Sequence, residues 1–237
     1  PLPTTAPRTA VAMSLDRSVI IEAQGGYPKP IESVVVPVFD YYDPNTPEID
    51  RDVDAANKRL DEAGYAKGGD GIREKDGKRL SFSFVVQAGR ADDELVQQII
   101  IAQRKAIGIE AQDDNKDGVA YREARYKGNY DLIYGRWITS ADPVYSVFYG
   151  TGGPNNGQGY SNPELDAAFA TFENSLDPAV RKKAASEFQT IIANDVPTIP
   201  LITNVAVIAK TKALKNFVPN PTNMTNFVNT AAWYMES

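Results

Sequence analysis

The sequence predicts an α/β fold, in which helices flank a mixed sheet. Segments with strand-like alternation are interleaved along the chain with segments of helical spacing, which is typical of this class. The 237 residues are 42% hydrophobic and 24% charged, ordinary values for a globular protein and enough to bury a core. Neither an internal repeat nor a clean linker divides the chain.

The first quarter of the chain predicts two helices and a long connection. Residues 7–15 have the four-residue apolar spacing of a short helix. Asp16 is expected to cap a second helix over residues 19–23, which a pair of glycines ends. Residues 27–50 contain five prolines and therefore predict an extended, irregular connection.

The middle of the chain predicts two strands and two helices. Asp54 is expected to cap a helix over residues 55–63. Residues 80–87 alternate apolar and polar side chains, as a strand with one buried face does. Residues 92–107 begin with acids and end with basic residues, as the dipole of a helix favours. Residues 130–137 predict a second strand.

The last third predicts two consecutive helices. Asn162 begins the first, whose apolar positions extend to Leu176, and Asp177 with Pro178 begins the second. Residues 204–208 have the composition of a strand, and the last twenty residues show no periodicity.

Composition excludes several functional classes. Histidine and cysteine are both absent, which removes Ser-His-Asp and Cys-His catalysis, His/Cys zinc sites and disulfides. A net charge of −6 with scattered signs excludes nucleic acid as a partner. The longest apolar runs are the length of a strand and too short to span a bilayer.

Local motifs do not indicate a metal, cofactor or catalytic residue. The run Asp113–Gly118 resembles the start of a calcium loop, but Ala124 stands where the bidentate glutamate belongs, so an ordinary polar turn is expected. The glycines at 150–153 lack the lysine and the spacing of a phosphate-binding loop. An enzyme working through paired carboxylates is the interpretation that the sequence favours least, after a solute binder and a structural domain.

One cluster has the chemistry of solute recognition. Flat aromatic surface, a guanidinium, hydroxyls and a carboxylate after a strand can bind a small polar solute by stacking and directed hydrogen bonds. The alternative, equally open from the residues, is that the rings pack in the core and the charges are solvated. The candidate ligand-binding residues are Tyr134, Arg136, Trp137, Thr139, Ser140, Asp142 and Tyr145.

A set of short segments occurs in a fixed order along almost the whole chain. The segments are Leu15-Asp16-Arg17, Leu60–Tyr65, Asp70–Arg73, Asp76–Leu80, Ile107–Ile109, Gly128–Leu132, the Trp137…Asp142-Pro143 turn, Gly159–Asp166 and Pro197–Leu201. Each segment alone is common, whereas the ordered set is specific. Together the segments resemble the C-terminal lobe of the periplasmic solute-binding proteins of ABC transporters, in the dipeptide/oligopeptide/nickel-binding family.

The resemblance implies a non-enzymatic carrier built as one lobe of a type II (cluster C) periplasmic binding protein. Residues 1–216 would form this second lobe, and residues 217–237 would return to a missing N-terminal lobe. The implied partners are a small-molecule solute, an ABC-transporter permease, that lobe, and a second copy of the chain through the exposed lobe interface. The implied location is the periplasm of a Gram-negative bacterium. With half the cleft absent, weak or no solute binding is expected.

Two departures from the family pattern affect the expected ligand and surface. Peptide binders usually place an aspartate where Ser140 stands, so an opine, a sugar or another small solute becomes as plausible as a peptide. Positions that are usually apolar hold Arg59, Arg104, Ala111 and Asp113, which suggests a chain altered for solubility or one whose matching surfaces are exposed. The alternative to a solute binder is an engineered or structural domain that keeps the fold without ligand function.

Overall fold

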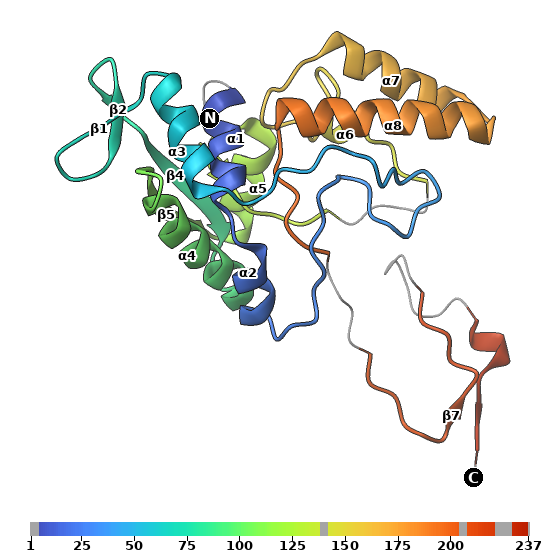
Figure 1. The fold of residues 1–237 in the computed structure, drawn as a ribbon. Helices are drawn as coiled ribbons and strands as arrows, with labels where there is room; N and C mark the ends of the chain where they lie inside the picture. Colours follow the sequence, from blue (N-terminus) through green and yellow to red (C-terminus); the bar gives the residue numbers. More distant parts are fainter. Residues whose placement is uncertain (1–4, 138–141, 204–207, 221–228, 237) are drawn as a thin grey trace. The chain divides into compact units, whose positions relative to one another are not determined.

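The computed structural model describes residues 5–137, 142–203, 208–220 and 229–236 (Figure 1). The chain divides into two compact units. The first unit comprises Pro1–Gly135 and Val144–Thr203, and the second comprises Arg136–Pro143 and Asn204–Ser237. Each unit is described by itself below.

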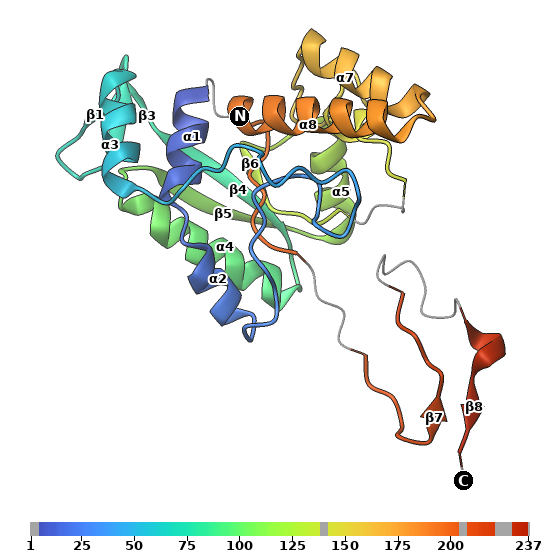
Figure 2. The ribbon, with the colours of Figure 1, turned by 45° about the vertical axis from the view of Figure 1, so that its right-hand side comes forward.

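A parallel sheet with strand order β5-β4-β6 is the centre of the first unit. The middle strand β4 (Ser81–Gln87) pairs along its whole length with β5 (Glu110–Lys116), and near its centre with β6 (Leu132–Ile133). Helices α4 (Ala91–Lys105) and α5 (Gly118–Lys127) cover opposite faces of this sheet (Figure 2). The predicted α/β class is confirmed, although the central sheet contains only parallel pairs among the described residues.

The antiparallel strands described in the first unit form a smaller sheet, and Pro30 and Ile202 form an isolated antiparallel bridge outside it. This sheet has the strand order β1-β2-β3 and is formed by β1 (Ala66–Lys67), β2 (Arg73–Lys75) and β3 (Lys78–Arg79). Asp76 and Gly77 both have positive φ, which closes the tight turn between β2 and β3.

The central strand β4 is buried more fully than simple alternation predicts. Phe84, Val85 and Val86 are 3%, 0% and 0% exposed, so side chains on both faces of the strand are covered. Helices on both faces explain this pattern, since each face of a parallel sheet then packs against a helix.

Three helices precede the sheet, and their starts depend on local capping. They are α1 (Thr5–Ser14), α2 (Arg17–Ala23) and α3 (Val53–Glu62). Asp16 caps α2 as predicted, accepting a hydrogen bond from the Ser18 backbone N–H. The prediction that Asp54 caps α3 is wrong, because Asp52 accepts from the Ala55 N–H at 2.8 Å and Asp54 lies in the first turn.

A helical hairpin holds the aromatic part of the core. α6 (Ser146–Tyr149) leads to α7 (Pro163–Asn174) and α8 (Pro178–Asp195), and Asn162 and Asp177 cap the two long helices as predicted. Buried rings of Phe169, Phe172 and Phe188 pack between them. Leu176, expected to continue the apolar face of α7, instead lies beyond its end and is 97% exposed.

The second predicted strand is much shorter than expected. Of residues 130–137, only Leu132 and Ile133 form ladder pairs, because β6 contacts β4 at only two positions. Residues 204–207 of the predicted strand at 204–208 lie outside the described part of the chain.

The run Asp113–Gly118, which resembles the start of a calcium loop, has a structural role. Its first part belongs to the edge strand β5, and Asp117 caps α5 by accepting from the N–H groups of Val119 and Ala120. Hydrogen bonds from those two N–H groups hold the pKa of Asp117 below its usual value. Within the described ranges, His, Cys, Asp and Glu form no group of three that could hold a metal ion.

The four unusual positions divide by exposure. Arg59 and Asp113 are exposed and Ala111 is half-buried, which agrees with the hypothesis of exposed surfaces. Arg104 contradicts it, because this residue is only 3% exposed and faces the Phe84 ring at 5.5 Å from its centroid. The alternative, a chain altered for solubility, stays a hypothesis.

The second unit contains a two-stranded antiparallel sheet, β7 (Leu214–Lys215) with β8 (Tyr234–Met235), and the short 3₁₀ helix η1 (Thr230–Ala232). Phe217 and Trp233 contact each other with ring centroids 5.2 Å apart. The second unit combines Asn204–Ser237 with Arg136–Pro143, and the expected boundary after residue 216, which runs between the two paired strands, stays a prediction.

A membrane-spanning helix is not found in the described ranges, because none of their helices combines the required length and apolar character.

Two glycines permit the close approach of the C-terminal end of α5 and the loop around residue 157 in the first unit. A Cβ on Gly157 would collide with the Arg125 backbone carbonyl, and one on Gly128 would collide with the Gly157 carbonyl. Gly157→Ala is therefore expected to lower the free energy of unfolding by about 2 kcal/mol or more, since backbone atoms have to move. Urea unfolding checks this. Gly69→Ala is the control, with open space around its Cβ and an expected change within about 0.5 kcal/mol.

Candidate functional site

The candidate site begins at the carboxyl end of the central sheet. Because β4 is flanked by β5 on one side and β6 on the other, the helices that connect these strands, α4 and α5, lie on opposite faces of the sheet. The point between β4 and β6 is therefore a topological switch point, where open α/β sheets bind ligands. Tyr134 is the first residue after β6, and its N–H donates to the Val85 carbonyl at 3.0 Å.

Tyr134 is the one predicted ligand residue at the edge of the first unit's sheet. Its side chain is half-buried and packs against the cluster around Phe84 and Ile100. Its carbonyl accepts a hydrogen bond from the Tyr121 hydroxyl at 2.9 Å. The backbone at this point is thus held on both its donor and its acceptor side.

Three further predicted residues lie in the second unit. Trp137 is 38% exposed, Arg136 is half-buried and Asp142 is exposed. A partly exposed indole can stack on a solute, and a guanidinium and a carboxylate can orient it. Thr139 and Ser140 lie outside the described residues.

Tyr145 lies in the core. It is 2% exposed, and its ring centroid is 5.0 Å from that of Phe188. Burial raises the pKa of its phenol well above the ordinary value, and the neighbouring Tyr41 raises it further. For this residue the structure supports core packing, the alternative that the sequence left open, and the ring has no surface to offer a solute.

The Gly150–Asn156 loop, which follows α6, uses many of its polar groups in internal hydrogen bonds. Thr151 N–H donates to an Asp166 carboxylate oxygen at 2.8 Å, and the Asn156 amide donates to the Gly150 and Tyr160 carbonyls at 2.8 and 2.7 Å. These bonds give the loop a defined shape without requiring a ligand.

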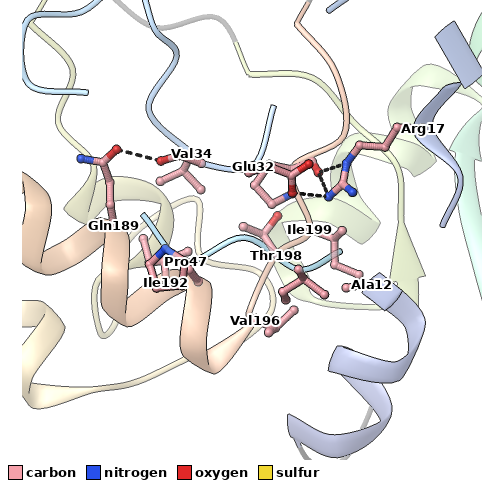
Figure 3. Close-up of a pocket in the computed structure, with 14 residues that line it drawn as sticks. Ala12, Arg17, Glu32, Val34, Pro47, Gln189, Ile192, Val196, Thr198 and Ile199 are labelled. Atoms are coloured by element: carbon pink, nitrogen blue, oxygen red, sulfur yellow. Dashed lines mark hydrogen bonds and ion pairs between the residues drawn. The ribbon is translucent and has the colours of Figure 1, made fainter. Parts of the chain in front are cut away.

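A pocket in the first unit lies apart from the predicted residues (Figure 3). It is lined by α1, α8, the long connection and the segment after α8. Arg17 extends along its wall, donating to the Glu32 carboxylate at 2.8 Å and to the Pro200 carbonyl at 3.0 Å. The volume open to the centres of water molecules is only about 20 Å³. This volume holds one or two ordered waters and is too small for a solute.

The polar groups of this pocket have structural partners. Ser33 donates to the Gln189 side chain at 2.8 Å, which in turn donates to the Tyr41 carbonyl at 3.0 Å. Burial raises the pKa of Glu32, and the Arg17 guanidinium opposes that rise. These contacts join the long connection, through Glu32 and Ser33, to α2 and α8.

Sequence reasoning did not identify the residues that bond to Tyr134 and to Ser146. Tyr121 lies on α5, thirteen residues before the carbonyl that it contacts. Glu173 lies at the end of α7 and accepts from both the N–H and the hydroxyl of Ser146, at 3.0 and 2.8 Å. No short motif contains either pair, so only the folded chain reveals them.

Comparison with known proteins identifies the family. The model of the bacterial extracellular solute-binding proteins, family 5 Middle, matches residues 1–159. Protein XP55 of Streptomyces lividans is 30% identical over 198 residues, which are 79% of this chain and 35% of that protein.

Solved structures share the fold. The oligopeptide-binding protein AppA of Bacillus subtilis, in complex with a nonapeptide, matches with a TM-score of 0.87 and 23% identity, over 98% of this chain and 48% of AppA. A periplasmic oligopeptide-binding protein of Thermotoga maritima, with bound mannohexaose, matches with a TM-score of 0.79 and 24% identity, over 86% and 42% of the two chains. The chain spans at most about half the length of these proteins. Because the family model matches two thirds of its residues, the chain belongs to the bacterial extracellular solute-binding proteins of family 5.

Proposed function

We propose that this chain forms one wall of a solute-binding cleft in a transport receptor, which delivers a small solute to an ABC-transporter permease. Members of the family are solute-binding transport components and not enzymes. In this proposal residues 1–216 are the second lobe, and residues 217–237 return to the other lobe. The family is extracellular, and the periplasm of a Gram-negative bacterium is the more specific location that we propose.

The observation that carries the proposal is the position of Tyr134 at the switch point of the sheet. The chain continues directly from there into Arg136 and Trp137, so aromatic and cationic groups follow the strand end where such sheets bind ligands. Asp142, Thr139 and Ser140 complete the proposed contacts. We leave Tyr145 out of the proposed contacts, because it is only 2% exposed in the aromatic core.

The chemistry favours a small polar solute with a face for stacking. Relatives of this fold include one protein titled as a peptide complex and one titled with a bound oligosaccharide. We propose a peptide, an opine or a sugar, because each combines hydrogen-bonding groups with a surface that an indole can cover. The binding experiment below distinguishes the three.

The 237-residue chain alone is expected to bind such solutes weakly or not at all. One wall leaves most of a small ligand in water, whereas ligand pockets bury 70–90% or more of it. Isothermal titration of the chain with di- and tripeptides, opines and oligosaccharides tests this. Micromolar binding by the chain alone would contradict the half-receptor part of the proposal, and a second copy seen by light scattering would indicate self-association through the lobe interface.

In a protein that contains both lobes, Trp137→Ala is expected to lower solute affinity by about 30-fold. The estimate corresponds to loss of a central aromatic contact worth about 2 kcal/mol. Leu176→Ala is the control, because Leu176 is 97% exposed at the turn between α7 and α8. Equal affinities of the two variants would contradict a solute contact by Trp137, and the absence of binding in the two-lobed parent would support a structural domain without ligand function.

A further inference from the structure

Asn156 and Gly157 form an Asn-Gly pair in the loop between α6 and α7, and no other asparagine of the sequence precedes a glycine. In such a pair the backbone nitrogen of the glycine can attack the side-chain Cγ of the asparagine, because a glycine has no side chain to hinder the approach. A bond forms between Gly157 N and Asn156 Cγ, and the Cγ–Nδ2 bond breaks. The amide nitrogen leaves as ammonia with the backbone proton, and water then opens the resulting succinimide to aspartate or isoaspartate.

The Asn156 side chain closes this loop in the folded chain. Its Nδ2 atom donates to the Gly150 carbonyl at 2.8 Å and to the Tyr160 carbonyl at 2.7 Å, and its Oδ1 atom accepts from the Tyr160 N–H at 3.2 Å. One half-buried amide thus joins residues on both sides of it in the sequence. A carboxylate could not replace it, because an ionised carboxylate only accepts hydrogen bonds.

The backbone around this pair is also fixed. The Asn156 N–H donates to the Gly153 carbonyl at 2.9 Å, and the Asn156 carbonyl accepts from the Gly159 N–H at 3.2 Å. Gly157 lies against the end of α5, where the Arg125 carbonyl leaves no room for a Cβ. The loop over residues 150–160 is therefore held in one shape by its own hydrogen bonds and by the helix beside it.

We propose that Asn156 is a site of spontaneous deamidation, and that the reaction waits for the loop 150–160 to open. Ring closure has to turn the Asn156 side chain toward the Gly157 nitrogen, and the three hydrogen bonds of the amide oppose this turn. After the reaction a carboxylate stands opposite the Gly150 and Tyr160 carbonyl oxygens, which have lost a donor and repel it. The modified loop cannot close as before, so the change acts in one direction. Nothing in this chemistry depends on solute binding.

Peptide mass spectrometry of the 237-residue chain, held at mildly alkaline pH with and without guanidinium chloride, tests the site. A gain of about 1 Da on the peptide that contains Asn156 reports the reaction. The unfolded chain is expected to react, and the folded chain to react about 10-fold more slowly or less, because the loop opens only part of the time. An amide that persists in the unfolded chain would overturn the site. Equal rates in the folded and unfolded chains would overturn the control by folding.

The dependence on denaturant distinguishes opening of the loop from unfolding of the whole chain. Below the unfolding transition, the rate at Asn156 is expected to change little with guanidinium chloride, because a local opening exposes little surface. A rate that rises in step with the unfolded fraction would overturn the role of the loop.

A bond at the end of the loop provides a second test of the opening. The Tyr160 hydroxyl donates to the Asp195 carboxylate at 2.5 Å, at the end of α8. Tyr160→Phe removes this bond and is expected to raise the rate at Asn156 in the folded chain by about 3- to 10-fold. Tyr126→Phe, at an exposed tyrosine on α5, is the control and is expected to leave the rate unchanged. Equal rates in these two variants would count against the loop as the gate.

Asn156→Asp imitates the modified chain. Its thermal midpoint is expected to lie about 4 °C or more below that of the parent, because two carbonyls lose a donor. Asn155→Asp is the matched control, since it adds the same charge at the neighbouring residue, whose side chain has no hydrogen bond to the described residues. Its midpoint is expected to change by less than about 2 °C. Equal midpoints of the two variants would overturn the one-way character of the change.

Discussion

Replacing Arg104 with methionine is expected to raise the free energy of unfolding by about 1–4 kcal/mol. Arg104 is 3% exposed on α4, and its Nε and Nη1 atoms have no hydrogen-bond partner among the described residues. Its ring contact with Phe84, at 5.5 Å, offsets only part of the cost of removing a guanidinium from water. Methionine has a similar length, no charge, and a sulfur suited to an aromatic neighbour.

Chemical denaturation over a range of pH measures this effect and identifies its cause. Burial lowers the pKa of Arg104 to about 9, so the unfolded chain holds this proton more tightly than the folded chain. The penalty in the parent is therefore complete below pH 9 and declines as the pH rises above it. The stability difference between Arg104→Met and the parent is expected to be constant up to about pH 9 and to narrow beyond.

Arg59→Met is the control for Arg104. Arg59 is exposed on α3, so the same change of side chain there is expected to alter stability by less than about 0.5 kcal/mol. A loss of stability in Arg104→Met would show that the buried guanidinium has a partner worth more than its desolvation.

Arg73→Met is expected to have the opposite effect and to lower the free energy of unfolding by about 3–5 kcal/mol. Arg73 is 1% exposed, but each nitrogen of its guanidinium donates a hydrogen bond. The Nε atom donates to the Ile107 carbonyl at 2.9 Å, and one terminal nitrogen donates to the Asn57 side chain at 2.9 Å. The other terminal nitrogen donates to Asp61 and to the Tyr65 carbonyl.

The expected loss of stability in Arg73→Met arises because methionine cannot donate the hydrogen bonds that Arg73 makes. Buried carbonyl groups that now accept from Arg73 would have no donor, and a buried acceptor without a partner costs about 1–3 kcal/mol. Arg79→Met, at a half-exposed arginine paired with Asp70 in the same small sheet, is expected to cost less than about 1 kcal/mol. Thermal unfolding of the two variants compares them, and equal midpoints would contradict the bonded role of Arg73.

Helix starts were predictable because their causes are local. Asn162 and Asp177 each cap the helix that follows within three residues, and the Asp16 cap obeys the same rule. Asp54 was the wrong choice because two aspartates stand close together and either could accept the free N–H groups. The position of the chain entering α3 selected Asp52.

Predictions that needed distant partners were less accurate. The strand expected over 130–137 is reduced to Leu132–Ile133, because the length of a strand depends on how far its neighbour runs beside it. Among the candidate ligand-binding residues, the sequence could not show that Tyr145 is buried in the aromatic core, and the binding role of the others stays a prediction. An aromatic residue after a strand has the same local pattern whether it packs inward or faces a solute.

The sequence by itself determined the family, through ordered motifs, and the absence of catalytic and metal chemistry that needs histidine or cysteine. Only the tertiary structure decided which buried arginine is paired and which is not. Arg73 and Arg104 are alike as residues, and they differ because the acceptors of Arg73 come from α3, from the turn after it and from the turn after α4. Such partners meet only when the chain folds, so no local pattern contains them.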